Sequence, residues 1–395
     1  MRFRRNLRSR TDGDIWKRFF RARCSRKLIC MIPLSRPVLG TEEATAIASV
    51  LETGRLVQGA RVAEFEALIA ERTGRRHAIA VCNGTAALRV ALEALLIGPG
   101  DRVLVPDLTW PSPAHAVLDL HATPVLVDVD RHEWNISPSS LRSLPPPTLR
   151  GLRAAIVIDQ FGLPARVREL QELLPDVPIL VDAACSLGSH TGQEPCGGLG
   201  VIACLSFHPR KVVTTGEGGM CLTDDPELAE CLRELRNHGQ SSPGSFGRAS
   251  GNYRLSDIAA AMGVVQLSRL SGMVEARTEL AARYTSALEG LVQMQRPAAG
   301  ARPNYQTFGV LLPEGRDREQ ALQALRALDI EAGKLSYALH TLPQFVSEAH
   351  EARELGQSFP NSIALAERGI ALPLWPGLST EDQSKVIDAV RAVVA

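Results

Sequence analysis

The sequence of 395 residues contains no long hydrophobic run. Its longest apolar stretches, such as residues 154–158 and 179–181, are far shorter than the roughly 18 consecutive apolar residues that a membrane-spanning helix needs. We therefore predict that the chain has no membrane segment. With 45% hydrophobic and 22% charged residues, its composition is that of a globular protein rather than a disordered one.

Cysteine is present, but never at the spacing typical of metal or redox motifs. None of the eight cysteines forms a C-x-x-C pair, and the cysteines and histidines are too scattered for a zinc site. We therefore predict no metal. A chain of this length does not need disulfides to hold its core, so we predict reduced thiols and a cytoplasmic location.

Two nucleotide-binding motifs are also absent. G-x-x-x-x-G-K-[ST] does not occur, and no G-x-G-x-x-G follows a predicted strand. These absences argue against a P-loop enzyme and against a dinucleotide dehydrogenase of the standard kind.

Charges of opposite sign nearly cancel over the whole chain, but they are unevenly distributed. Residues 1–30 contain 11 Lys and Arg against 2 Asp and Glu, which leaves 33 basic and 41 acidic residues in the remainder. The acidic remainder argues against nucleic acid as a partner. For the basic N-terminal extension we expect an organellar address, a nucleic-acid tail, or a disordered segment before a later translation start.

From residue 75 onward, short β-branched runs alternate with amphipathic helical stretches. Apolar residues at helical spacing predict helices at residues 85–95 and 165–174. Buried strands are predicted at six apolar runs: residues 77–81, 101–106, 123–129, 154–159, 177–183 and 201–207. This alternation predicts an α/β fold, with a mostly parallel central sheet covered by helices on both faces. In such sheets ligands collect at the carboxyl ends of the strands.

The pattern changes after about residue 265, which predicts a second domain. A long helical stretch at residues 260–291 leads to a mixed α/β segment that ends in a helix at residues 381–394. We predict a large domain at residues 31–265 and a smaller C-terminal α/β domain at residues 266–395.

The stretch SFHPRKVVTTGEGGM places Lys211 between an apolar strand and a loop rich in glycine and threonine. A lysine in this setting serves chemistry or phosphate binding rather than solvation. A second stretch, VCNGTAALRVAL, passes from a strand through Asn83, Gly84 and Thr85 into a helix. The N–H groups of Thr85 and Ala86 and the Thr85 hydroxyl can bind an anion there, or Asn83 or Thr85 is an ordinary N-cap.

Other groups with suitable chemistry also follow strands. Asp107, Asp128, Asp159 and Asp182 hold comparable positions, and position alone does not choose among them. Trp110 is either a core residue or a platform for a flat ring. An amine, a carboxylate, an anion site and an aromatic ring at one sheet edge are what pyridoxal 5'-phosphate requires. The carboxylate keeps the pyridine nitrogen protonated, and a desolvated lysine becomes nucleophilic.

From residue 32 to the C-terminus the chain resembles the DegT/DnrJ/StrS family of sugar-nucleotide aminotransferases, which are pyridoxal phosphate enzymes with the aspartate-aminotransferase-like fold type I. The resemblance covers nearly all of the chain except the first 31 residues. It rests on nine stretches in the family's order: IPLSRPVLG, GRLVQGARVAEFE, NGTAALRVAL, PDLTWPSPAHAV, VDAACSLGS, SFHPRKVVTTGEGGM, LRNHG, GNYRLSDIAAAMGVVQL and LPLWPGLSTEDQ. Each stretch alone is weak evidence, but the ordered set is specific.

The resemblance implies roles for individual residues. Lys211 matches the Schiff-base lysine, and Asp182 matches the acid that pairs with the pyridine nitrogen. Trp110 matches the aromatic residue that stacks on the cofactor, and Asn252 matches a residue that reaches the phosphate site of the neighbouring subunit. The phosphate contacts of the family match four residues: Gly84, Thr85, Ala86 and Ser206. A homodimer with shared active sites is implied.

One position departs from the family pattern. Cys185 stands where relatives often carry a Gln or His that touches the phenolic oxygen of the cofactor, and a thiol is a weaker hydrogen-bond partner. His208 and Arg210 are expected to do no more than shape the cleft. Tyr337 and His340 either close on the substrate from the small domain or pack in the core.

The resemblance implies a transamination in which Lys211 moves the α-proton. The donor is expected to be L-glutamate, and the acceptor a keto-sugar linked to a nucleoside diphosphate or, less often, a keto-cyclitol. Residues 143–148 and 241–251 are predicted surface loops, and the second is expected to read the substrate. Two alternatives stay open. One is sugar deoxygenation, for which relatives replace the lysine with histidine; the other is a non-catalytic, regulatory homologue.

Overall fold

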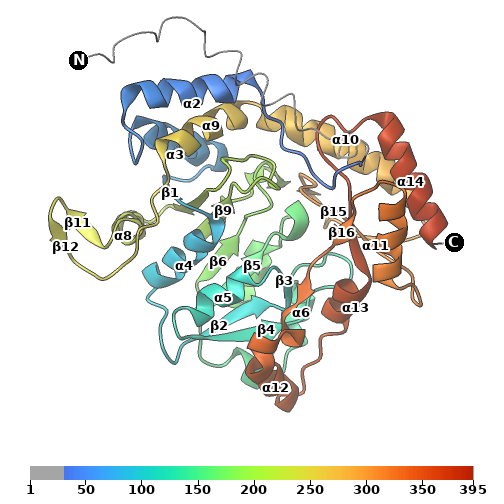
Figure 1. The fold of residues 1–395 in the computed structure, drawn as a ribbon. Helices are drawn as coiled ribbons and strands as arrows, with labels where there is room; N and C mark the ends of the chain where they lie inside the picture. Colours follow the sequence, from blue (N-terminus) through green and yellow to red (C-terminus); the bar gives the residue numbers. More distant parts are fainter. Residues whose placement is uncertain (1–30, 395) are drawn as a thin grey trace, which may run out of the picture.

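The computed structural model describes residues 31–394, so the basic extension at residues 1–30 lies outside the described residues. At its centre is a seven-stranded sheet in the order β1-β10-β9-β6-β5-β2-β4 (Figure 1). β10 is antiparallel to both of its neighbours, and the other pairs are parallel. The strands of this sheet are β1 (His77–Val81), β2 (Arg102–Pro106), β4 (Thr123–Val127), β5 (Leu152–Ile158), β6 (Ile179–Asp182), β9 (Ile202–Ser206) and β10 (Gly219–Thr223).

The strands are apolar over most of their length because helices cover both faces of the sheet. In β1, β2, β4 and β9 four of five residues are buried, and in β6 and β10 every residue is buried. The six predicted strands are all present, and the predicted fold class is confirmed. β10 is an additional strand that the sequence does not predict, because the glycines of GEG directly precede GMCLT and interrupt the apolar pattern.

Helices contribute to a separate apolar core on each side of the sheet. One core contains residues of α3 (Ala60–Thr73), α6 (Pro138–Arg142), α7 (Val167–Leu173), α9 (Asp257–Ser268) and the start of α10 (Leu270–Leu288). The other contains residues of α4 (Gly84–Ala94), α5 (Ser112–Leu118), α8 (Pro226–Arg236) and α12 (Val346–Glu354). The single long helix predicted at residues 260–291 is thus two helices, which meet at Arg269.

The C-terminal part of the chain builds a second, smaller sheet beside the first (Figure 1). Its antiparallel strands, in spatial order, are β13 (Gln293–Met294), β15 (Phe308–Leu311), β18 (Gly369–Leu372) and β16 (Gly333–Lys334). Residues of α10, α11 (Arg318–Ala327) and α14 (Thr380–Val394) complete its apolar core.

Other C-terminal segments return to the large sheet. β17 (Tyr337–Ala338) pairs with β3 (Leu108–Thr109), and α12 packs on β4. α13 (Pro360–Arg368) lies between β17 and the small sheet. The chain after residue 265 therefore contributes to the surroundings of both sheets.

The remaining elements lie at the periphery. α2 (Thr41–Thr53) packs on α9, and β7 (His190–Thr191), β8 (Glu194–Pro195) and β14 (Ala301–Arg302) form a small antiparallel sheet. The predicted loop at residues 241–251 contains part of a hairpin, β11 (Gln240–Ser242) and β12 (Ser245–Phe246), which projects from the body (Figure 1). Among residues 31–394 no helix is long and apolar enough to span a membrane.

Candidate active site

The sheet topology brings most of the predicted site residues to one edge. β2, β5, β6 and β9 run parallel, and β1 has the same direction because β10 is antiparallel to both β1 and β9. The carboxyl ends of these strands therefore meet at one edge of the sheet. Asp182 ends β6, Ser206 ends β9, and Gly84 follows β1.

Lys211 lies in the loop after β9, where its Nζ contacts the Sγ of Cys185 at 3.1 Å. The loop is held locally, since the Lys211 N–H donates to the His208 carbonyl at 2.8 Å. The described part of the chain contains two further lysines, and each is paired with a glutamate: Lys334 with Glu319 at 3.1 Å and Lys385 with Glu381 at 2.9 Å.

Lys211 is the one lysine within residues 31–394 that has no carboxylate within 4.0 Å. It is also half-buried, whereas the side chains of Lys334 and Lys385 are 47% and 57% exposed. An amine that is partly removed from water and not neutralised by a carboxylate is suited to act as a nucleophile.

Asp182 is buried at the end of β6, and its burial raises the pKa of the carboxyl group. The Ala184 N–H donates to Asp182 Oδ1 at 3.0 Å, and the charge of Lys211 opposes the shift. Within the described residues no side chain donates a hydrogen bond to this carboxylate. Burial deprives this carboxylate of hydration by water. A positively charged ligand atom beside it would compensate for that loss.

The other three strand-end aspartates bind protein groups. Each carboxylate has a close side-chain partner: Asp107 binds His340 Nδ1 (2.7 Å), Asp128 accepts from the Ser362 hydroxyl (2.6 Å), and Asp159 accepts from the Ser186 hydroxyl (2.6 Å). Their contacts join segments of the fold. Asp182 is the member of the four whose charge interacts with Lys211.

The loop before α4 has the geometry of a capped helix N-terminus. The Ala86 N–H donates to the Asn83 side chain at 2.8 Å, so Asn83 is the N-cap. The alternative that Asn83 is an N-cap is therefore confirmed, and it occupies the Ala86 N–H that the anion-site alternative leaves free. The N–H groups of Gly84 and Thr85 have no intrahelical partner and remain available to an anion at the positive end of the helix.

Gly84 also packs tightly against the end of β9. A Cβ atom at Gly84 would lie 2.8 Å from the Cβ of Ser206, closer than such atoms approach each other. Only glycine allows the α4 loop and Ser206 to come this close. The two backbone amides and the Ser206 hydroxyl therefore lie in one small region.

Trp110 follows β3 with 62% of its surface exposed, and its ring meets the edge of Tyr337 at a centroid distance of 5.5 Å. Tyr337 is brought there because β17 pairs with β3, which sets Tyr337 opposite Thr109. His340 is buried instead, stacked on Phe359 at 4.5 Å. Of the two expectations for these residues, core packing therefore describes His340, whereas Tyr337 is positioned beside Trp110.

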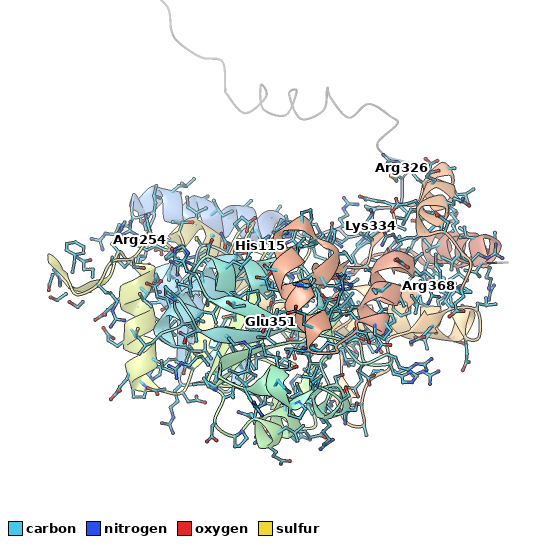
Figure 2. The ribbon with its side chains drawn as sticks, turned by 90° about the horizontal axis from the view of Figure 1, so that it is seen from below. His115, Arg254, Arg326, Lys334, Glu351 and Arg368 are labelled. Atoms are coloured by element: carbon cyan, nitrogen blue, oxygen red, sulfur yellow. The ribbon has the colours of Figure 1, made fainter. Side chains whose placement is uncertain are left out.

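Asn252 is exposed in a segment that runs beside the end of β1. The backbone carbonyl of Tyr253 accepts a hydrogen bond from the Cys82 N–H at 2.7 Å, and Arg254 pairs with Val81. In Figure 2 Arg254 lies on the same side of the molecule as the β11–β12 hairpin, across from Lys334. The segment thus lies close to the loop that precedes α4.

Two residues that the sequence did not single out contact the loops of Lys211 and Cys185. Asn304 donates to the carbonyl of Cys185 at 2.9 Å, and Gln306 donates to the carbonyl of Arg210 at 2.8 Å. Both lie in irregular chain far from Lys211 in sequence, and no motif marks them.

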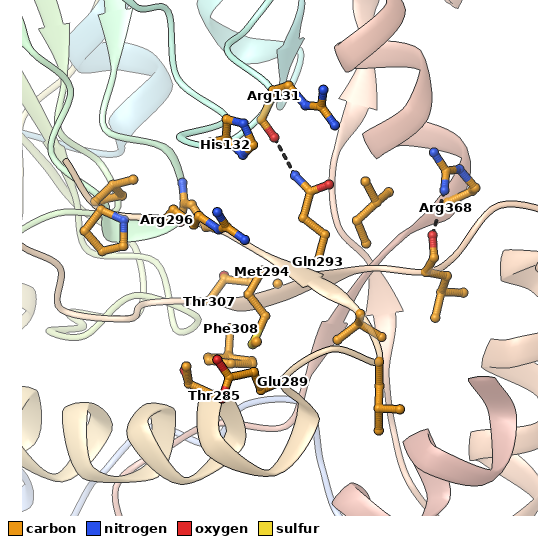
Figure 3. A pocket seen from close by; sticks show the side chains of 18 of the residues that line it. Arg131, His132, Thr285, Glu289, Gln293, Met294, Arg296, Thr307, Phe308 and Arg368 are labelled. Carbon is orange, nitrogen blue, oxygen red and sulfur yellow. Dashed lines mark hydrogen bonds between the residues drawn. The ribbon is translucent and has the colours of Figure 1, made fainter. Parts of the chain in front are cut away.

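A cavity of about 820 Å³ lies apart from these residues, between β13, β15 and the loop after β4 (Figure 3). Its lining includes Arg131, Gln293, Arg296 and Phe308, and none of the predicted site residues. Among residues 31–394 no group of three His, Cys, Asp or Glu side chains is arranged to hold a metal ion.

The chain is similar over most of its length to characterised and solved proteins. The spore coat polysaccharide biosynthesis protein SpsC of Bacillus subtilis (strain 168) is 32% identical over 389 residues, which cover 92% of this chain and 97% of that protein. The structure of a DegT DnrJ EryC1 StrS aminotransferase from Brucella abortus is 32% identical, with a TM-score of 0.82 over 89% of this chain and 95% of that one.

A second solved structure is that of S. venezuelae DesV in complex with a ketimine intermediate. It is 33% identical and has a TM-score of 0.82, covering 90% of this chain and 94% of that chain. A family model matches residues 37–391. The chain therefore belongs to the DegT/DnrJ/EryC1/StrS aminotransferase family, whose members depend on pyridoxal phosphate.

Proposed function

We propose that this aminotransferase binds pyridoxal 5'-phosphate through Lys211 and transfers an amino group from L-glutamate to a keto-sugar carried on a nucleoside diphosphate. The observation that carries the proposal is the unpaired Lys211 amine next to Cys185, with the buried Asp182 beside it at the carboxyl edge of the sheet. When bound, pyridoxal phosphate supplies an electron sink that stabilises negative charge at the carbon next to the transferred amine.

The groups present fit the parts of this cofactor. The N–H groups of Gly84 and Thr85 and the Ser206 hydroxyl suit its phosphate, and Gly84 leaves the space that a side chain would fill. The buried Asp182 carboxylate suits a protonated ring nitrogen, because the positive charge offsets the loss of hydration. The exposed ring of Trp110 offers a flat apolar surface.

The side chains have separate tasks in this proposal. Lys211 would hold the cofactor through its amine, and the same amine is placed to move the α-proton of the donor. Asp182 would keep the ring nitrogen protonated. Cys185 lies close enough to Lys211, at 3.1 Å, to orient the amine. The edge contact with Tyr337 restricts the tilt of the Trp110 ring.

The nature of the substrate is inferred from the relatives. SpsC takes part in spore coat polysaccharide biosynthesis by its name, and polysaccharides are assembled from activated sugars. A sugar nucleotide extends well beyond its reacting keto carbon, so we expect exposed elements around the site to contact it. The hairpin of β11 and β12 contains part of residues 241–251, which are expected to read the substrate, and it projects from the body beside α8 (Figure 1).

We also propose a homodimer that shares its active sites and works in the cytoplasm, with Asn252 serving the partner's phosphate site. Apolar side chains are exposed close to the Asn252 segment: Leu56 and Val57 are 40% and 55% exposed. Val57 pairs with Ser256, four residues beyond Asn252. A second copy of the chain would remove this apolar surface from water.

Reduction by borohydride followed by peptide mapping tests the assignment. After reconstitution with pyridoxal phosphate, we expect the reduced cofactor on Lys211 and not on Lys334 or Lys385. Lys211→Ala should keep its thermal unfolding midpoint but lose turnover by about 10³-fold or more, since both the imine link and the proton carrier disappear. Lys334→Ala is the matched control, and label at another residue would contradict the assignment.

The acceptor is tested in a separate assay. Purified enzyme is incubated with glutamate and either nucleoside-diphosphate keto-sugars or keto-inositols, and formation of 2-oxoglutarate is measured. The proposal requires turnover with the nucleotide-linked sugars. If only the keto-inositols are turned over, the substrate class is a keto-cyclitol instead.

A further inference from the structure

Residues 304–306 lie in the C-terminal part of the chain, yet they hold both loops that meet at the Lys211–Cys185 contact. Asn304 bonds to the Cys185 loop and Gln306 bonds to the Lys211 loop. The two loops follow different strands, β6 and β9. A short segment with one hydrogen bond to each loop is placed to control their separation.

Asn304 is completely buried, and its amide is fully used. Its Nδ2 donates to the carbonyl oxygens of Cys185 and Leu187, both at 2.9 Å, and its Oδ1 accepts from the Gln306 N–H at 2.8 Å. The backbone N–H of Asn304 donates to the Ser189 hydroxyl at 2.9 Å. The Cys185 loop is therefore attached to Asn304 at three points.

Gln306 is 8% exposed and reaches the other loop. Its Nε2 donates to the carbonyl of Arg210 at 2.8 Å, directly before Lys211 in sequence. The Thr307 hydroxyl donates to its Oε1 at 2.9 Å, which fixes the orientation of the amide. Gln306 thereby restrains the backbone that carries the Lys211 side chain.

The segment itself is anchored from the small sheet side. The buried Arg277 of α10 donates to the carbonyl oxygens of Tyr305 at 3.1 Å, Gln306 at 3.3 Å and Leu374 at 3.2 Å. Burial lowers the pKa of Arg277 to about 10, so the guanidinium stays charged at neutral pH and its hydrogen bonds are charge-assisted. The segment has a rigid support independent of the two loops.

We propose that Asn304 and Gln306 are positioning residues that set the distance between the Lys211 amine and the Cys185 thiol, and so the orientation of the group bound at Lys211. The proposal rests on the function proposed above for Lys211. Through Arg277, the small-sheet part of the chain then sets the separation of Lys211 and Cys185, although both of these residues follow strands of the large sheet.

Gln306→Ala is the primary test, because it removes the bond to Arg210 without placing a new polar group in the site. Gln293→Ala is the matched control: Gln293 also joins the C-terminal part to the large-sheet part by one bond, from Nε2 to the Arg131 carbonyl at 2.5 Å (Figure 3). Thermal unfolding by far-ultraviolet circular dichroism identifies variants that fold. Asn304→Asp is a second variant, interpreted only where its unfolding midpoint matches that of the control.

Two measurements do not depend on turnover. The first is the rate at which iodoacetamide alkylates Cys185 in the cofactor-free protein, followed by peptide mapping. Release of the loops should raise this rate at least about threefold in Gln306→Ala. The second is the visible circular dichroism of the protein with pyridoxal phosphate, which reports how the cofactor is oriented and should fall to about half or less. The value of kcat should fall about tenfold in the same variant.

The positioning role is overturned if Gln306→Ala matches the wild type in both the alkylation rate and the dichroism, or if Gln293→Ala changes both as much as Gln306→Ala does. A wild-type protein that develops no visible band with pyridoxal phosphate contradicts the function proposed for Lys211 instead. In that case the alkylation measurement still decides whether Gln306 holds the loops, because it uses the cofactor-free chain.

Discussion

At the scale of single residues, the partners of a side chain distinguish reactive groups from structural ones. Lys211 contacts a thiol, whereas Lys334 and Lys385 contact carboxylates. Asp182 is buried beside Lys211, whereas Asp159 accepts hydrogen bonds from the Ala165 N–H and the Ser186 hydroxyl. The two buried carboxylates should therefore respond differently to replacement.

Asp159 gives a pH-dependent contribution to stability that can be measured. Burial raises the pKa of Asp159 from 3.8 to about 6, although the Ala165 N–H and the Ser186 hydroxyl oppose the shift. The folded state therefore binds the proton more tightly than the unfolded chain. This stabilisation is complete below about pH 4 and is lost as the pH rises through about 6, by about 3 kcal/mol in all.

Comparison with Asp159→Asn isolates this contribution. The unfolding free energy of the wild type, minus that of the variant, should fall by about 3 kcal/mol between about pH 4 and pH 7 in denaturant titrations. Burial also raises the pKa of Asp107 and Glu133, but these groups are present in both proteins and cancel in the difference. The charge of Asp182 is one cause of the raised pKa of Asp159, so their repulsion is part of the measured difference. A difference that does not change with pH would contradict the raised pKa.

Single residues also show how much of the site the sequence reveals. The apolar strand before Lys211 predicted that this residue lies at the carboxyl edge of the sheet, where parallel sheets bind ligands. The same reasoning gave four equivalent aspartates, and only the resemblance to the family singled out Asp182. Asn304 and Gln306 were not predictable. Their partners are backbone carbonyls more than 90 residues away, and a carbonyl has no sequence signature.

At the scale of elements, the short strand β17 matters because it brings Tyr337 to Trp110. Two backbone pairs alone would hold it weakly. The buried contact between His340 Nδ1 and Asp107 at 2.7 Å, together with the bond from the His340 N–H to Asp107 at 2.8 Å, fixes the segment that follows. β17 therefore depends on a polar contact in the core.

His340→Ala should destabilise the protein by about 3 kcal/mol, because it leaves the Asp107 carboxylate buried without its side-chain partner. Thermal or denaturant unfolding measures this loss. His350→Ala is the control, since His350 lies beside Glu354 with 71% of its side chain exposed, and its loss should change stability by no more than about 0.5 kcal/mol. Equal effects of the two substitutions would show that the Asp107 contact does not hold the segment.

Elements were predictable where the apolar pattern was regular. β1 has the bounds expected from HAIAV, and α14 begins within one residue of the expected helix. β10 was missed because glycine precedes it, and antiparallel insertion between β1 and β9 depends on the sheet as a whole. The break between α9 and α10 was missed because Arg269 is a good helix former, and the nearest glycine, Gly272, lies inside α10 rather than at the break.

At the scale of the whole molecule, we propose that the chain functions as a homodimer. The Asn252 segment lies beside exposed apolar side chains, yet it also runs along Val81 and Cys82 of its own subunit. The geometry of one chain therefore allows Asn252 to contact the phosphate site of its own subunit or that of the partner. Mixing two inactive variants distinguishes these arrangements.

Lys211→Ala lacks the amine, and Asn252→Asp places a negative charge at the proposed phosphate site, so each homodimer should be nearly inactive at limiting cofactor. If Asn252 serves the partner, a mixed dimer has one site with both intact residues. Random exchange makes about half of the dimers mixed, so activity should recover to about a quarter of the wild-type value. Two different affinity tags confirm that subunits exchange. Exchange without recovery would assign Asn252 to its own subunit, because both sites of a mixed dimer would then be defective.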